Sequence, residues 1–121
     1  MDDSILISIK KLLGIEKDDK SFDTDIIIHI NSAIMNLSQI GVGSSSGFAI
    51  SDENDTWSDF TLDANNTEAV KSYVYIKVKL MFDPPSSSAV IDALERQAKE
   101  LEWRINTSVD PGKTYSEANI V

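Results

Sequence analysis

Apolar residues recur at a three-four spacing near the end of the chain, and this pattern constrains the fold more than any other feature of the sequence. The residues are Ile91, Leu94, Ala98, Leu101 and Ile105. This spacing places the five side chains on one face of a helix. Acids precede bases by four residues in three pairs, which supports the same helix: Asp92–Arg96, Glu95–Lys99 and Glu100–Arg104. With N-cap candidates at residues 86–88, the pattern predicts a helix over residues 87–106.

The preceding segment, residues 67–82, has two competing interpretations. Apolar residues alternate with polar or aromatic ones, as in a half-buried strand, at Val74, Ile76, Val78 and Leu80. The length of the segment, the helix-start residues 66–68 and the stop at Asp83-Pro84-Pro85 favour a helix. We therefore predict a helix over residues 67–82, joined to the next one as an antiparallel helical hairpin.

Two amphipathic segments occupy the first third of the chain. The first, residues 4–13, ends at Gly14, a residue suited to a helix C-terminus. The second, residues 24–40, has Asp23 as its expected N-cap and Gly41 as its expected C-cap. The expected apolar positions are Ile5, Ile9, Leu12 and Leu13 in the first, and Ile26, Ile27, Ile30, Ala33, Ile34 and Leu37 in the second. Both segments are predicted to be helices.

Residues 41–66 differ in composition, because they are rich in Gly, Ser, Asn and Asp, with short apolar islands at 48–50 and 57–62. We predict a long acidic loop in which these islands can pair as a short β-hairpin. The polar residues 107–121 predict an extended C-terminal tail. With 121 residues the chain has the length of one domain. The predicted fold is mainly α, a small antiparallel four-helix bundle in residues 1–106 followed by the tail 107–121.

The formal net charge of −9 is concentrated in one stretch of the chain. No Lys or Arg occurs between Lys20 and Lys71, whereas eight acids do: Asp23, Asp25, Asp52, Glu53, Asp55, Asp59, Asp63 and Glu68. Binding to a phosphate backbone requires clustered cations. The sequence therefore argues against a sequence-specific nucleic-acid reader, while a surface that stays near DNA without binding it is compatible with this charge.

The N-terminus and the cysteine content indicate the compartment. The chain has no cysteine, which excludes disulfides, thiolate nucleophiles and sulfur-ligated zinc. Acids open the sequence, and Lys10 and Lys11 interrupt the first apolar run. We therefore expect neither a signal peptide nor a membrane span, and we predict a protein of the cytoplasm of a cell or host.

No motif typical of catalysis occurs in the sequence. Phosphate-binding glycine loops and the GxSxG and HExxH patterns are absent, and the only histidine, His29, has no partner at ligand spacing. A calcium-binding EF-hand loop is matched in part, at Asp52, Asn54, Thr56 and Asp63. Trp57, however, occupies the position where that loop requires glycine. We predict no enzymatic activity, no cofactor, no metal, and a solvated acidic loop.

Three aromatic residues have two interpretations each. Trp57 and Phe60 in the acidic loop are either core residues of the hairpin or anchors for a partner, and the sequence favours neither. Trp103 lies off the apolar seam of the last predicted helix. It either covers a second packing face of the same chain or contacts another subunit, and the first requires fewer assumptions.

Three short segments carry a family resemblance. They are Phe82-Asp83-Pro84-Pro85 at the end of a tyrosine-rich helix, Glu102-Trp103-Arg104 at the end of the last helix, and Ile40-Gly41-Val42-Gly43. Together they resemble the head-tail connector (adaptor) proteins of long-tailed bacteriophages, over about residues 5–106. The resemblance implies a structural protein of the virion's head-tail interface, assembled in the host cytoplasm. It implies a dodecameric ring of this chain beneath the portal protein, which extends the DNA channel and docks stopper or tail-completion proteins.

The resemblance also implies roles for two segments. Double-stranded DNA would pass through the ring without specific binding, and no membrane is involved. The acidic residues expected toward the lumen or the ring-to-ring face are Asp52, Glu53, Asp55, Asp59 and Asp63. The tail residues expected to reach the portal are Val109, Tyr115, Ile120 and Val121. The alternatives are a non-phage interaction module that dimerises through residues 87–106, and an enzyme or metal-binding domain that uses His29 and the acidic loop.

Overall fold

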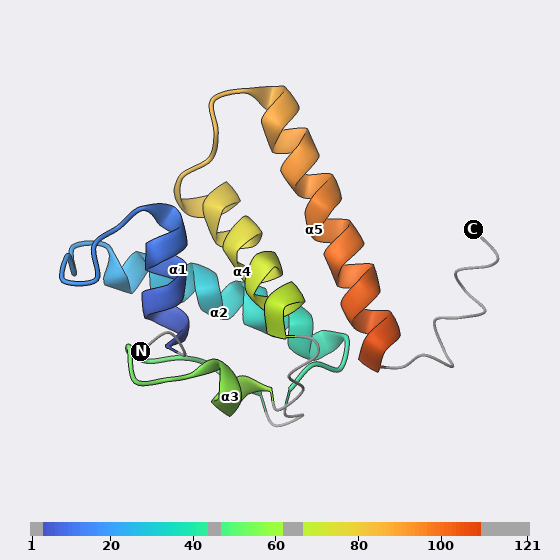
Figure 1. Cartoon of the computed structure of the whole chain (residues 1–121), viewed down its shortest axis with the longest axis horizontal. Helices are drawn as coiled ribbons and strands as arrows, with labels where there is room; N and C mark the ends of the chain where they lie inside the picture. The colour runs from blue at the N-terminus through green and yellow to red at the C-terminus, as the bar shows by residue number, and fades with distance from the viewer. Residues whose placement is uncertain (1–3, 44–46, 62–66, 110–121) are drawn as a thin grey trace.

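The computed structural model describes residues 4–43, 47–61 and 67–109 (Figure 1). Within these ranges the chain forms five helices and no strand: α1 (Ile5–Leu13), α2 (Asp23–Gln39), α3 (Trp57–Phe60), α4 (Thr67–Phe82) and α5 (Ser88–Val109). The prediction of a mainly helical fold is confirmed. None of the helices in the described part of the chain is long and apolar enough to cross a bilayer.

Helix α4 lies at the centre of the fold. It packs against α1, α2 and α5, and α1 also packs against α2. Figure 1 shows α4 and α5 running in opposite directions, joined by the turn that contains Pro84 and Pro85. The predicted antiparallel helical hairpin is confirmed.

The central position of α4 explains why its sequence alternates like a strand. Its buried residues are Val70, Tyr73, Val74, Ile76 and Val78. A helix that is covered on several sides carries apolar residues around much of its circumference and has only weak amphipathic periodicity. The alternation over residues 74–80 therefore reflects burial on more than one side.

Helix α1 ends where the sequence predicts but begins one residue later, because Ser4 is its N-cap. The Ile7 amide donates to the Ser4 side chain at 3.2 Å, and Gly14 has the left-handed φ of 84°. Helix α2 already begins at Asp23, without a side-chain cap, so the predicted Asp23 N-cap is wrong. The Asp23 carboxylate pairs with Lys10 instead. At the other end, α2 finishes at Gln39 and its C-cap is Ile40, so the predicted Gly41 C-cap is also wrong. Gly41 follows the cap with a φ of 98°, the conformation of a glycine that terminates a helix.

The core joins residues from every helix. The predicted stripe of α2 is buried at Ile26, Ile30, Ala33, Ile34 and Leu37, and α5 buries Ala98, Leu101 and Ile105. One predicted core residue is wrong, because Leu12 of α1 is 53% exposed. Lys10 is buried in its place, since backbone carbonyls and a carboxylate satisfy its ammonium group.

Helix α5 is longer than its sequence pattern predicts. It continues to Val109, so residues 107–109 are helical and do not belong to an extended tail. The Thr107 hydroxyl donates to the Trp103 carbonyl at 2.9 Å, so its polar side chain finds a hydrogen-bond partner within the helix. The other tail residues named above, Tyr115, Ile120 and Val121, lie outside the described residues.

The predicted β-hairpin is not present in residues 47–61. Residues 57–60 form the short helix α3, and residues 48–50 pair with no strand. The cause is a capping box: the Asp59 amide donates to Thr56 Oγ1, and the Thr56 amide donates to Asp59 Oδ2. These reciprocal bonds close a helical turn where a strand was expected, and only an isolated bridge joins Thr56 to Ser4.

Candidate functional site

The acidic segment, defined here as residues 47–61, lies along one side of the molecule, below α1 in Figure 1. Its first fastening point is Asn31 on α2. The Asn31 side-chain amide donates to the Ile50 carbonyl at 3.1 Å, and the Ile50 amide donates to Asn31 Oδ1 at 2.8 Å. Asn31 thus provides both bonds that a neighbouring strand would provide, and Ile50 is buried.

The acidic side chains shape the segment themselves. Asp55 Oδ2 accepts from the Ser51 amide at 2.7 Å and from the Asp52 amide at 3.3 Å. Asp52 Oδ1 accepts from the Asn54 amide at 2.8 Å. These are the turn-forming bonds that short acidic side chains make with nearby backbone. Asp52, Glu53 and Asp59 still expose much of their surface to solvent.

Helix α3 is the second fastening point, through Trp57 and α1. The Trp57 indole donates to Ser8 Oγ at 2.9 Å, and the Ser8 hydroxyl lies 2.7 Å from the Ser4 carbonyl oxygen to which it donates. The Ile5 amide donates to the Asp55 carbonyl at 3.0 Å. Trp57 is buried, so it is a core residue of this chain, although of a helical turn and not of a hairpin.

Phe60, the other aromatic residue of α3, is also buried and meets Gly43 at close range. Gly43 has φ +79°, and a Cβ atom there would lie 2.7 Å from the Phe60 carbonyl oxygen. Both the backbone conformation and the lack of space require glycine. The Phe60 ring also packs on Phe48, with 5.3 Å between the ring centroids.

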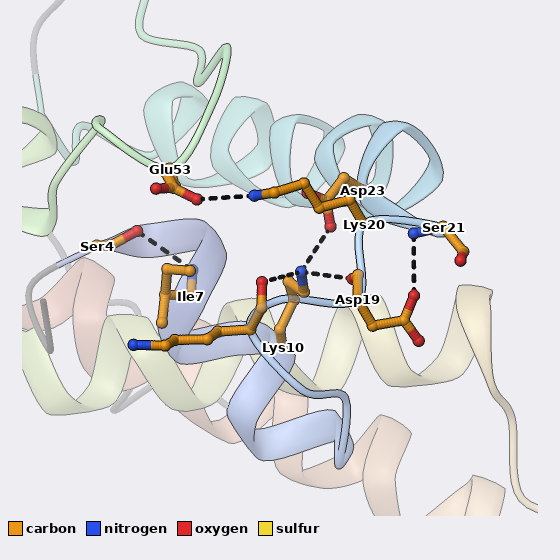
Figure 2. Close-up of polar contacts among 9 residues, drawn as sticks. Ser4, Ile7, Lys10, Asp19, Lys20, Ser21, Asp23 and Glu53 are labelled. Carbon is orange, nitrogen blue, oxygen red and sulfur yellow. Dashed lines mark hydrogen bonds and ion pairs between the residues drawn. The ribbon is translucent and has the colours of Figure 1, made fainter.

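A third group of contacts holds the acidic segment through the linker between α1 and α2, and it begins at Lys10 (Figure 2). Its ammonium group donates to the Lys17 carbonyl at 3.1 Å and the Asp19 carbonyl at 2.8 Å, and pairs with Asp23 at 2.8 Å. These bonds hold the linker between α1 and α2 in place. At its far end Lys20 pairs with Glu53 at 3.2 Å, and this hydrogen bond raises the pKa of Lys20. The linker thereby connects to the acidic segment.

The residues considered for catalysis or metal binding do not converge. His29 lies half-buried on α2, and its ring is near Phe82, with 6.4 Å between the centroids. In the described part of the chain, no group of three or more His, Cys, Asp or Glu side chains could hold a metal ion. Of the partial EF-hand pattern, Asp63 lies outside the described residues and Trp57 is buried.

Trp103 on α5 is the most exposed aromatic residue in the part of the chain that the structure describes. It is 53% exposed, so the interpretation that it packs inside its own chain is wrong. Helix α5 packs mainly against α4. This contact covers the apolar face of α5 but leaves the side that carries Trp103 exposed. A shallow hollow of about 470 Å³ is lined by Lys99, Glu100, Trp103 and Arg104.

The cations beside Trp103 have no acidic partner within the described structure. The three i,i+4 pairs predicted on α5 do not form ion pairs. The ion pairs found among the described residues involve the lysines of other segments: Lys10, Lys20, Lys71 and Lys79. Arg96, Lys99 and Arg104 all lie exposed on α5. The surface around Trp103 therefore combines an apolar ring with two unpaired cations, Lys99 and Arg104, and the acid Glu100.

The sequence was also compared with known proteins. A protein-family model described as "Phage connector protein" matches residues 5–112, from the start of α1 to beyond the end of α5. The chain belongs to the phage connector protein family. The searches of curated proteins and of solved structures gave no match.

Family membership confirms the resemblance noted in the sequence and gives the protein its general role. Phage connector proteins are structural components of the virion rather than enzymes, and they interact with portal and tail proteins. The sequence pointed to the acidic residues and to Trp103. It gave no sign of the residues that hold the acidic segment and the neighbouring linker in place, chiefly Asn31, Lys10 and Ser8. Of the contacts described above, only the capping box at Thr56 and Asp59 has a local sequence signature, [ST]-x-x-[DE].

Proposed function

We propose that this connector assembles as a ring beneath the portal, extends the DNA channel and presents a platform for stopper or tail-completion proteins. The observation that carries the proposal is the family match over residues 5–112, which includes every helix described above. The exposed Trp103 supports self-assembly, because an exposed tryptophan beside an arginine is typical of a protein interface. A dodecamer assembled in the host cytoplasm is the proposed form.

The acidic segment is proposed to face the ring lumen or the next ring. Its support is the exposure of Asp52, Glu53 and Asp59 together with the absence of Lys and Arg between Lys20 and Lys71. Phosphate groups are repelled by such a surface, so DNA would pass without specific binding. The proposal extends to Asp55, and to Asp63 outside the described residues.

The C-terminal residues are proposed to reach the portal. Val109 is the last residue of α5, so it stands at the point where the remaining chain departs. The proposed portal contacts beyond it are Tyr115, Ile120 and Val121. This role derives from the family resemblance, and the deletion of residues 110–121 tests it separately from ring formation.

The decisive experiment uses DNA-filled, portal-bearing heads produced without this protein. Purified connector is added, and heads are separated by sedimentation and imaged by electron microscopy. We expect the connector to co-sediment with the heads, to appear as a ring below the portal and to restore tail attachment. Heads that join tails at the normal frequency without the protein would refute the proposed function. A chain ending at Val109 should fold, measured by circular dichroism, but should not co-sediment.

A further inference from the structure

Helices α2 and α5 both pack on α4, and each keeps a part of its surface exposed. Both use their buried residues against the core that contains α4. The exposed residues Ile28 and Met35 on α2 and Trp103 on α5 therefore form two different patches of one molecule. Rings of identical subunits are built from heterologous contacts, in which one surface of a subunit meets a different surface of the next.

The exposed face of α2 carries two large apolar residues and is nearly uncharged. Ile28 is 56% exposed and Met35 is 62% exposed, and the two residues stand two helical turns apart on the same stripe. Ser32 lies between them. After Asp25 no residue of α2 is an acid or a base other than His29. Depletion of charge together with exposed methionine is characteristic of the centre of a protein interface.

The exposed face of α5 offers complementary chemistry. Trp103 supplies a large apolar ring, and the hollow beside it is lined by two cations, Lys99 and Arg104, and one acid, Glu100. Neither cation has an ion-pair partner in the described structure, so positive charge is in excess there. A surface that receives this face must be apolar and free of cations. Among the described helices longer than one turn, α2 is the helix without Lys or Arg, and its exposed acid is Asp25.

We propose that Trp103 of one subunit docks on the Ile28–Met35 face of α2 in the next subunit, with Lys99 and Arg104 directed toward its Asp25. The occupant of each face is a second copy of this chain. The inference rests on the proposed ring and specifies its subunit contact. It uses neither the acidic segment nor the C-terminal residues, so both stay available for the lumen and the portal. Methionine suits this site, because its flexible thioether adapts to an aromatic ring.

The absence of cysteine from the chain allows a direct test by site-specific crosslinking. Because the contact itself requires Met35 and Trp103, the cysteines replace exposed neighbours of these residues, Ser32 on α2 and Glu100 on α5. The variant Ser32→Cys/Glu100→Cys is treated with a short bismaleimide, both as purified protein at high concentration and on portal-bearing heads. We expect a ladder of covalent dimers, trimers and larger species, because each subunit has one reactive group on each side of the contact. A mixture of the two single variants should stop at heterodimers.

Matched controls separate this contact from others. Leu12 of α1 is exposed and lies outside the proposed contact, so Leu12→Cys/Glu100→Cys should give no ladder. A dimer formed by Glu100→Cys alone would indicate a two-fold contact through α5 and would overturn the inference. Light scattering and electron microscopy of the same samples report assembly independently of crosslinking. Rings without the Ser32–Glu100 ladder would refute this contact and leave the proposed function standing, whereas the absence of rings in both samples would refute both.

Alanine substitution gives the energetic counterpart. Trp103→Ala and Met35→Ala should each raise the concentration at which half of the subunits assemble, the former by about tenfold or more, as expected for a tryptophan hot spot. Leu12→Ala should leave that concentration unchanged. All three positions are exposed in the single chain, so circular dichroism should show the native helix content. An unchanged midpoint for Trp103→Ala would contradict the inference.

Discussion

The ammonium nitrogen of Lys10 lies 2.8 Å from a carboxylate oxygen of Asp23, and the lysine side chain is only 1% exposed. The same nitrogen donates to two linker carbonyls. We predict that Lys10→Met destabilises the fold by roughly 3 kcal/mol, because it leaves Asp23 and both carbonyls without their partner. Urea unfolding measures the change. Lys11→Met is the control, since Lys11 is exposed, and equal stabilities of the two variants would contradict the prediction.

Asn31 holds the acidic segment through its two bonds to Ile50. Asn31→Ala should cost about 2 kcal/mol of unfolding free energy, because the buried Ile50 backbone loses both a donor and an acceptor. Hydrogen exchange of the Ile50 amide should accelerate more than exchange in α5. Ser32→Ala, an exposed change on the same helix, should alter neither quantity. Unchanged exchange at Ile50 in Asn31→Ala would show that other contacts hold the segment.

Gly43 and Gly47 form a matched pair for the close approach of Phe60. Both have positive φ, but only at Gly43 would a Cβ meet Phe60, whereas nothing lies within 4 Å at Gly47. Gly47→Ala should cost about 1 kcal/mol for its backbone conformation alone. Gly43→Ala should cost roughly 2 kcal/mol more, because Phe60 must also move. Thermal or urea unfolding of both variants checks the difference, and similar losses would mean that α3 shifts without cost.

Tyr73 of α4 donates a hydrogen bond to Glu102 of α5 at 2.9 Å. Burial, and then this bond, raise the pKa of Tyr73 to about 12 from its ordinary value of 10.0. The folded state therefore keeps the phenol proton longer than the unfolded state. The associated stability is present in full below pH 10 and is lost as the pH rises through about 12.

This loss amounts to roughly 3 kcal/mol for a shift of about two pKa units. It is measured as the difference in unfolding free energy between the natural protein and Tyr73→Phe from pH 8 to pH 12. The natural protein should lose its advantage over the variant across that range. Since the lysines titrate in both proteins, their contribution cancels. A constant difference across the range would contradict the prediction.

The acidic segment provides a functional prediction. Asp52→Lys combined with Glu53→Lys should give the connector a measurable affinity for double-stranded DNA, which weakens as salt is raised. In the proposed ring the same variant should slow DNA passage and lower the yield of infectious particles. Lys11→Arg, which conserves an exposed charge on α1, is the control. Normal DNA passage with two added lysines per subunit would place these residues away from the lumen.

Helices α1, α2, α4 and α5 were predictable because each has a periodic or punctuated signal in the sequence, whereas α3 was not predicted. The α5 seam and the glycine after α1 are local features, and the structure agrees with both. The burial of Lys10 was not predictable, since its partners lie in a linker that has no periodic pattern. The same holds for Asn31, whose two bonds join residues 19 positions apart.

The aromatic residues show a different limit of sequence reasoning. The capping box at Thr56 and Asp59 is readable in the sequence and favours a helical turn, yet the composition around it suggested a hairpin. For Trp103, the periodicity of α5 identifies the seam but does not tell how many neighbours surround the helix. Only the packing of α5 mainly on α4 leaves this tryptophan exposed.

The acidic segment has little regular structure, yet Asn31, Ser8 and Lys20 fasten it to the helices around it. Its conformational freedom is lost when the single chain folds. An irregular segment that was loose beforehand would lose that freedom during assembly and would weaken every contact by the corresponding entropy. A subunit whose acidic segment is already ordered does not lose this entropy on assembly. More of the free energy of its docking contacts therefore stabilises the assembly.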